Sequence, residues 1–156
     1  NAYRVHASVG ILYNHESPYR KGDYICRKIV DAVVSILRKK SENLLLSDLS
    51  ARVDLGYAGD YAQAMYEITM LDKPEEFIVS SGSFPRVEDI VSYAFDYVGM
   101  DWRKYVSERP SGRKSKRGPM HGNNEKLRRI AGWKPSLSTR QLVELMIDQE
   151  NAKPES

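Results

Sequence analysis

The sequence predicts an α/β fold in which strands pair in parallel and a helix-rich second half forms a smaller lobe. Two mostly apolar runs, residues 5–14 and 77–80, are bounded by polar residues, as expected of strands buried in a parallel sheet. Segments with helical spacing of apolar residues separate these runs, and strands joined by helices favour parallel pairing. With 156 residues, of which 41% are hydrophobic and 29% charged, the chain can bury a core of its own.

The first half of the chain contains two predicted helices. Pro18 and Gly22 mark a loop after the first strand, and a helix of about four turns is predicted to follow it. A short strand is predicted at residues 44–46. The apolar positions of the first helix recur at helical spacing opposite charged ones, at Ile25, Ile29, Val33 and Leu37. The next helix is marked by Asp60, Tyr61, Ala64, Met65, Ile68 and Leu71.

Capping signals delimit the helices of the second half. After the strand at 77–80, Pro85 is expected to set the first turn of a helix that Gly99 closes at its C-terminus. A short helix is predicted around residues 125–131. The last helix is predicted to open at Ser138, which has capping-box spacing to Gln141.

The positive charge of the chain is concentrated in one segment. Residues 103–129 contain ten Lys or Arg against Glu108 and Glu125, whereas the whole chain carries a net charge of only +3. Such a segment suits a phosphorylated ligand, nucleic acid or an anionic surface, or is a solvated basic loop, and composition alone does not choose among them. Nucleic-acid binding is the weakest interpretation, because no helix-turn-helix or aromatic-rich sheet accompanies the segment.

Several classes of site are excluded by what the sequence lacks. A single cysteine, Cys26, excludes a disulfide framework and a multi-cysteine zinc site, and three widely spaced histidines make no metal signature. The chain has no glycine-rich dinucleotide loop, P-loop, nucleophile elbow or His-Glu-x-x-His pair. No stretch approaches 18 apolar residues and no secretory signal is visible, so we expect a cytoplasmic protein without a membrane span.

One segment is far more specific than the others. Residues 14–20 directly follow the first strand, at the strand end where open α/β sheets bind their ligands. The chain resembles the GDP-mannose 4,6-dehydratases, which are extended short-chain dehydrogenase/reductase enzymes, through Arg27-Lys28-Ile29 and the run Gly10-Ile11-Leu12-Tyr13-Asn14-His15-Glu16-Ser17-Pro18. The resemblance continues through Asp54-x-Gly56-x-Ala58-Gly59-Asp60-Tyr61-x-x-Ala64-Met65 and Gly132-Trp133-Lys134-Pro135.

The resemblance implies the last strands of a Rossmann-type parallel sheet and a smaller C-terminal α/β substrate-binding lobe. Residues 1–22 would supply the C-terminal strand and loop of the Rossmann-type domain, and 23–156 mainly the sugar-nucleotide-binding lobe, with 76–82 returning to the Rossmann sheet. The family's NADP loop and catalytic residues are expected upstream of residue 1, in a longer protein. Tyr24 and Lys28 have Tyr-x-x-x-Lys spacing but follow the strand, so they are not the catalytic pair.

NADP is the cofactor that the resemblance implies, with His15 and Arg20 as its contacts in this span. An imidazole can hydrogen-bond a nicotinamide carboxamide or a ribose, and a guanidinium can fork onto phosphate. Glu16 is expected to orient a neighbour as a hydrogen-bond acceptor rather than to act as a catalytic base. No catalytic residue is expected within the chain itself.

Three residues are candidates for holding the nucleotide sugar: Lys28, Asp48 and Arg113. Lys28 matches a family lysine, although a solvated helix position is equally open, and Asp48 stands where the family has asparagine. Val53 occupies the place of an arginine that clamps the diphosphate, and valine donates no hydrogen bond. Arg113, in a remodelled basic segment, takes the place of a second family arginine. Either this segment holds the diphosphate or the natural substrate differs from GDP-mannose.

The leading hypothesis is an NADP-dependent nucleotide-sugar 4,6-dehydratase of the GDP-mannose type. In the family reaction, hydride leaves C4 of the sugar for NADP, water is eliminated across C5 and C6, and the hydride returns to C6. The alternatives are another extended short-chain epimerase or reductase, and a non-catalytic truncated relative that binds a nucleotide sugar. Family enzymes form dimers or tetramers, so a homo-oligomer is expected, and the 156-residue chain alone is expected to be inactive.

Overall fold

The computed structural model describes residues 5–109 and 121–154 of the chain. Strands and helices alternate over most of the sequence, as the predicted α/β class requires. The elements are β1 (Val9–Leu12), β2 (Asn14–Glu16), α1 (Ile25–Leu37), β3 (Leu44–Leu46), β4 (Leu55–Tyr57), α2 (Ala58–Thr69), β5 (Glu76–Val79), α3 (Val87–Tyr97), the 3-10 turn Trp102–Lys104, β6 (Val106–Glu108), α4 (Glu125–Ala131) and α5 (Thr139–Asn151).

All three strand pairs are parallel, as predicted. β1 and β2 follow one another with only Tyr13 between them, and they pair with different partners. β5 runs beside β1, with Gly10 opposite Phe77, and β4 runs beside β2, with His15 opposite Gly56. β3 pairs with β6 at a separate place in the fold. The carboxyl end of β2 therefore lies beyond the β1–β5 pair, next to the start of α2.

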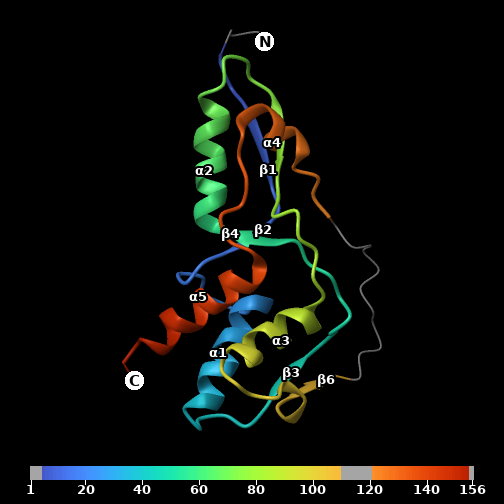
Figure 1. The fold of residues 1–156 in the computed structure, drawn as a ribbon, viewed down its shortest axis with the longest axis vertical. Helices are drawn as coiled ribbons and strands as arrows, with labels where there is room; N and C mark the ends of the chain where they lie inside the picture. Colours follow the sequence, from blue (N-terminus) through green and yellow to red (C-terminus); the bar gives the residue numbers. More distant parts are fainter. Residues whose placement is uncertain (1–4, 110–120, 155–156) are drawn as a thin grey trace.

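The larger of two apolar clusters lies among α1, α3 and α5, at one end of the molecule (Figure 1). Each of these helices presents an apolar stripe, and the side chains that meet there are almost fully buried. Leucines of β3 and β4 complete the cluster. Its central members are Ile29, Val33, Ile90, Ala94, Leu142 and Met146.

A second apolar cluster holds the β1–β5 pair against α2 and α4 at the other end of the molecule (Figure 1). Phe77 and Val79 of β5 pack with Ile68 of α2 and Leu127 of α4. A Cβ added at Gly10 of β1 would lie 3.4 Å from the Ile68 side chain, which shows how closely α2 approaches the strand. These strands and helices thus share a core that is distinct from the larger cluster.

The prediction that the first strand is buried is wrong for the described residues. Val9 and Ile11 are 50% and 49% exposed, and Leu12 is 39% exposed. α2 covers the face that carries Gly10 and Phe77, but no described element covers the face with Val9 and Ile11. The prediction of a strand from this apolar run is correct, but burial of a parallel sheet requires elements packed on both of its faces, and the described residues supply them on one face only.

The predicted helix ends agree well with the structure. Gly99 adopts a φ of +72° just after α3, where its N–H and that of Met100 donate to carbonyls of the last turn. Ser138 and Gln141 form the predicted capping box at α5. Pro85 differs slightly from the prediction, because it precedes the N-cap Arg86 rather than opening the helix itself.

Three strands were not predicted as such: β2, which lies in the segment expected to follow the first strand, and β4 and β6. β4 and β6 have three residues each, too few to show an alternation of apolar and polar side chains. Across the described residues, no helix is long and apolar enough to cross a membrane.

Candidate functional site

The loop after β2 borders a hollow of about 440 Å³ at the carboxyl end of that strand. The strand supplies its last two residues to the rim, and the loop and the start of α2 supply the rest. This is the edge at which parallel α/β sheets bind ligands. The lining residues are His15, Glu16, Ser17, Tyr19, Arg20, Lys21, Tyr24 and Ala58.

The His15 ring is fixed in one tautomer when it is neutral. Its Nδ1 lies 2.9 Å from the carbonyl oxygen of Tyr13, and because a carbonyl only accepts, Nδ1 donates. The Tyr61 ring packs against the imidazole, with 4.9 Å between the two centroids. Nε2 then carries the lone pair, and no hydrogen bond to it occurs within residues 5–109 and 121–154. The ring can therefore accept a hydrogen bond from an amide or hydroxyl of a ligand.

Glu16 and Arg20 form an ion pair at the edge of the same hollow. Arg20 Nε lies 3.1 Å from Glu16 Oε2, and the Glu16 side chain is only 3% exposed, whereas that of Arg20 is 33% exposed. Burial raises the pKa of Glu16 above its ordinary 4.5, although the adjacent Arg20 guanidinium acts in the opposite direction. The contact is an ion pair, since neither Glu16 Oε2 nor Arg20 Nε has a hydrogen-bond partner among the described residues, and the role of Glu16 as an orienting acceptor stays a prediction.

A buried carboxylate connects this region to the end of β5. Asp54, 1% exposed, precedes β4 and accepts hydrogen bonds from the Ser81 N–H at 2.8 Å and from the Ser81 hydroxyl at 2.6 Å. The Gly122 N–H also points at it, at 3.3 Å. A Cβ at Gly56 would come within 2.4 Å of the Tyr61 ring, so only glycine allows β4 to pass that close to α2.

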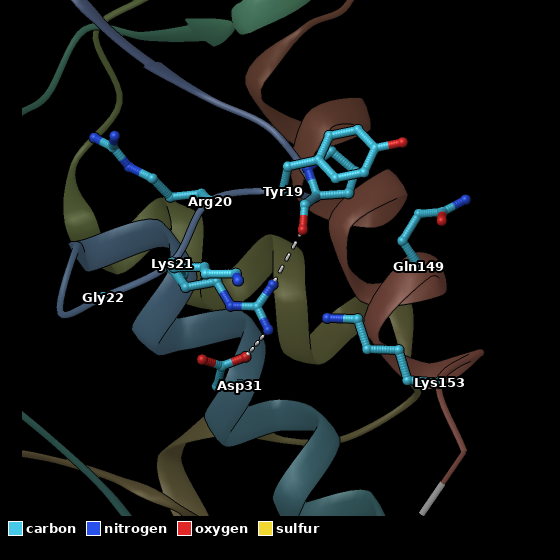
Figure 2. Close-up of a pocket in the computed structure, with 9 residues that line it drawn as sticks. Tyr19, Arg20, Lys21, Gly22, Asp31, Gln149 and Lys153 are labelled. Atoms are coloured by element: carbon cyan, nitrogen blue, oxygen red, sulfur yellow. Dashed lines mark hydrogen bonds and ion pairs between the residues drawn. The ribbon is translucent and has the colours of Figure 1, made fainter.

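A second hollow, of about 420 Å³, lies between the loop at 18–22 and the end of α5 (Figure 2). Its floor is Arg27, which donates to Glu150, approaches Asp31 to 2.5 Å and reaches the Pro18 carbonyl at 3.4 Å. Lys153 pairs with Glu150 as well, at 2.6 Å. Figure 2 shows Arg20 extending away from Gln149 and Lys153. Asp31 and Glu150 pair with Arg27 and Lys153, so these four side chains tie α1 to the end of α5. Lys21 also lines the hollow and makes no ion pair with a described residue.

Of the candidate sugar-nucleotide residues, neither Lys28 nor Asp48 lines the first hollow. Lys28 lies in α1 with its Nζ 3.6 Å from Asp23 Oδ1 and does not line the hollow. Asp48 lies in the loop after β3, where its Oδ1 accepts from the Ser50 N–H, the Ser50 hydroxyl and the Ala51 N–H. Arg113 and the rest of the basic segment at 110–120 lie outside the described residues.

Sequence reasoning overlooked two residues of the region. The spacing of Tyr24 to Lys28 gives no sign that the Arg20 Cζ lies 3.5 Å above the centre of the Tyr24 ring. The motif that contains Asp54 likewise does not show that this residue is the buried acceptor between β4 and β5. An aspartate among apolar neighbours was the available signal, because a buried charge needs partners.

Comparison with known protein families identifies the family to which the chain belongs. A model of the family described as GDP-mannose 4,6 dehydratase matches residues 1–146. The chain belongs to the GDP-mannose 4,6-dehydratase family. GDP-mannose 4,6 dehydratase 2 of Arabidopsis thaliana is 34% identical over 150 residues, and GDP-mannose 4,6 dehydratase of Homo sapiens is 31% identical over 165 residues. These matches cover 96% and 94% of the chain but only 40% and 44% of the two relatives.

Two solved structures have a fold similar to that of this chain. RMD from Pseudomonas aeruginosa, complexed with NADPH, superposes with a TM-score of 0.86 at 14% identity, covering 97% of this chain and 49% of that one. A dTDP-glucose 4,6-dehydratase from Bacillus anthracis, in complex with NAD, gives 0.77 at 16% identity and covers 95% and 45%. The predicted fold class, an α/β architecture with strands of a Rossmann-type parallel sheet, is confirmed. The chain spans less than half the length of these relatives.

Proposed function

We propose that the chain is part of an NADP-dependent nucleotide-sugar 4,6-dehydratase of the GDP-mannose type. The observation that carries the proposal is the pair His15 and Arg20 on the rim of one hollow at the carboxyl end of β2. Kinship supports it, because the family model covers residues 1–146. The active enzyme would need the remaining length that the relatives have.

The groups on the rim fit a nicotinamide dinucleotide. His15 offers an acceptor at Nε2 because Nδ1 donates to Tyr13, and a carboxamide N–H or a ribose hydroxyl suits that acceptor. The terminal nitrogens of Arg20 suit a phosphate group, because a guanidinium presents two parallel donors. Two of the solved relatives are described as complexes with NADPH and with NAD, which supports a nicotinamide cofactor in this chain as well.

When bound, the nicotinamide would accept hydride from sugar C4 and return it to C6. The chain's own residues would orient that ring and its phosphates: His15 through Nε2, and Arg20 through the edge that Glu16 leaves free. Glu16 would not serve as the base, because its carboxylate faces Arg20 and is almost entirely buried. The proton-transfer groups of the reaction would come from outside the described residues.

Substrate contacts are proposed at Lys28, Asp48 and Arg113, with the nucleotide sugar lying in the lobe built on α1, α3 and α5. Residues 1–22 and 76–82 would belong to the Rossmann-type domain and most of 23–156 to this lobe. α2 and α4 would join the Rossmann-type part, because they share the cluster of β1 and β5. A homo-oligomer is proposed as for other members of the family.

Val53 favours a second candidate, a related enzyme acting on a different nucleotide sugar. Its side chain packs against the larger apolar cluster, and its N–H donates to the Pro85 carbonyl at 3.1 Å. It cannot contribute the charged hydrogen bonds that an arginine at this place would give a diphosphate. A substrate bound differently at the diphosphate, or an epimerase or reductase reaction, would accommodate this change.

The test is a turnover experiment with isotopically labelled substrate. The protein from the complete reading frame is incubated with NADP and with GDP-mannose carrying deuterium at C4, beside dTDP-glucose and UDP-glucose. A 4,6-dehydratase gives a 4-keto-6-deoxy product with deuterium at C6. A product that is only epimerised at C4 favours the second candidate, and a folded protein that converts none of the three contradicts the proposal.

A further inference from the structure

The guanidinium of Arg20 is held on two sides by residues from different elements. Its Nε faces Glu16 Oε2 at 3.1 Å, and its Cζ lies 3.5 Å above the centre of the Tyr24 ring. Glu16 ends β2, and Tyr24 is the N-cap of α1. A carboxylate therefore fixes one edge of the guanidinium plane, and an aromatic ring supports one of its faces.

Both supports are themselves fixed by backbone hydrogen bonds. Glu16 lies in register with Tyr57 of β4. The Tyr24 carbonyl accepts the first helical hydrogen bond of α1, from the Lys28 N–H at 2.8 Å. In the loop between Glu16 and Tyr24, the Arg20 N–H donates a hydrogen bond of 3.0 Å to the Ser17 carbonyl, which forms a turn. The Arg20 side chain thus lies between the end of β2 and the start of α1.

This arrangement leaves one edge of Arg20 available. No described residue makes a hydrogen bond or an ion pair with either of its terminal nitrogens. A guanidinium that is stacked on a ring loses little further freedom when it binds a ligand, because its plane is already set. By contrast, Arg27 in the first turn of α1 has two carboxylate partners and a carbonyl.

We propose that Tyr24 is a positioning residue, whose ring holds Arg20 so that its terminal nitrogens meet a phosphate group of the bound dinucleotide. This inference rests on the proposed function of the site. The contact is made through the face of the ring, so the phenol hydroxyl is not required. Tyr24 acts through Arg20 and touches neither the substrate nor the reacting atoms.

The first test is a titration of NADP into the protein from the complete reading frame. Tyr24→Leu should weaken NADP affinity about threefold to tenfold, because the plane of Arg20 is no longer held, and Tyr24→Phe should stay within about twofold of wild type. In an Arg20→Ala background, Tyr24→Leu should have no further effect. Tyr66→Leu is the matched control, since this tyrosine of α2 is 60% exposed and its ring contacts no cation among the described residues.

Two outcomes of the titration would overturn the proposal. One is an unchanged NADP affinity in Tyr24→Leu. The other is a loss in Tyr24→Leu that is equally large without Arg20, which would mean that the ring stabilises the loop in general rather than this side chain.

A second measurement separates this inference from the proposed function. Hydrogen exchange at Arg20 Nε–H, followed by NMR without any ligand, should be slow in wild type and Tyr24→Phe and faster in Tyr24→Leu. If no variant binds NADP but the exchange rates differ in this order, the cofactor assignment fails while Tyr24 still positions Arg20. Equal exchange rates in all three proteins would contradict the positioning role whatever the ligand.

Discussion

At the scale of single residues, Glu16 is subject to two opposing effects. Burial disfavours its charged form, and the Arg20 guanidinium at 3.1 Å favours it. Burial is the larger effect, so the pKa of Glu16 lies above its ordinary 4.5. The folded state consequently binds a proton on this carboxyl more readily than the unfolded state does. The buried carboxylate therefore costs stability near neutral pH.

Glu16→Gln should therefore change how stability depends on pH. When the pKa of a carboxyl is higher in the folded state than in the unfolded state, the group stabilises the fold below the unfolded pKa. That stabilisation is lost as the pH rises through the folded pKa. Between about pH 4 and about pH 7, the wild type should lose stability relative to Glu16→Gln, which has no proton to release. Urea unfolding of both proteins at the two pH values measures this. A wild type that gains relative stability with pH would show instead that the ion pair outweighs burial.

At the scale of elements, the long helices were predictable from the sequence, whereas most of the three-residue strands were not. The apolar positions of α1 repeat over 13 residues, and α5 was predicted from the capping-box spacing of Ser138 and Gln141. β4 and β6 carry three residues each, which is too short for a period, and they lack the unbroken apolar run by which β3 was predicted. The position of Arg20 between Glu16 and Tyr24 was likewise not predictable, because it depends on how β2 and α1 meet in space.

Asp54 offers a test of how the elements are held together. Asp54→Asn replaces a buried acceptor of three hydrogen bonds by a group that brings an N–H toward the donors of Ser81 and Gly122. We expect a loss of about 1–3 kcal/mol in the free energy of unfolding, measured by urea denaturation. The control Asp23→Asn, at a carboxylate 87% exposed, should stay within about 0.5 kcal/mol of wild type. Equal effects of the two substitutions would argue against the anchoring role.

At the scale of the whole molecule, the chain has the fold of its family but less than half the length of its relatives. The exposed face of β1, with Val9 and Ile11, is apolar where a parallel sheet is ordinarily covered on both sides. The chain also contains no glycine-rich dinucleotide loop. The resemblance predicted the family and the fold class correctly, whereas Arg113 lies in a segment outside the described residues.

The 156-residue chain alone should neither bind NADP tightly nor dehydrate a sugar nucleotide. The reason is that the phosphate-cradling turn and the proton-transfer tyrosine of the family are not in its sequence. An assay of the purified chain with NADP and GDP-mannose checks this. Detection of a 4-keto product would mean that the chain carries a catalytic apparatus of its own.

The central claim is that the carboxyl end of β2 holds the cofactor through Arg20. Titration calorimetry of NADP into the protein from the complete reading frame tests it most directly, with wild type compared to Arg20→Ala. Loss of a charged hydrogen bond to phosphate should weaken NADP binding by about 1.5–3 kcal/mol and leave affinity for the sugar nucleotide nearly unchanged. An unaltered NADP affinity in the variant would contradict this claim and mean that Arg20 is a solvated surface residue with no part in cofactor binding.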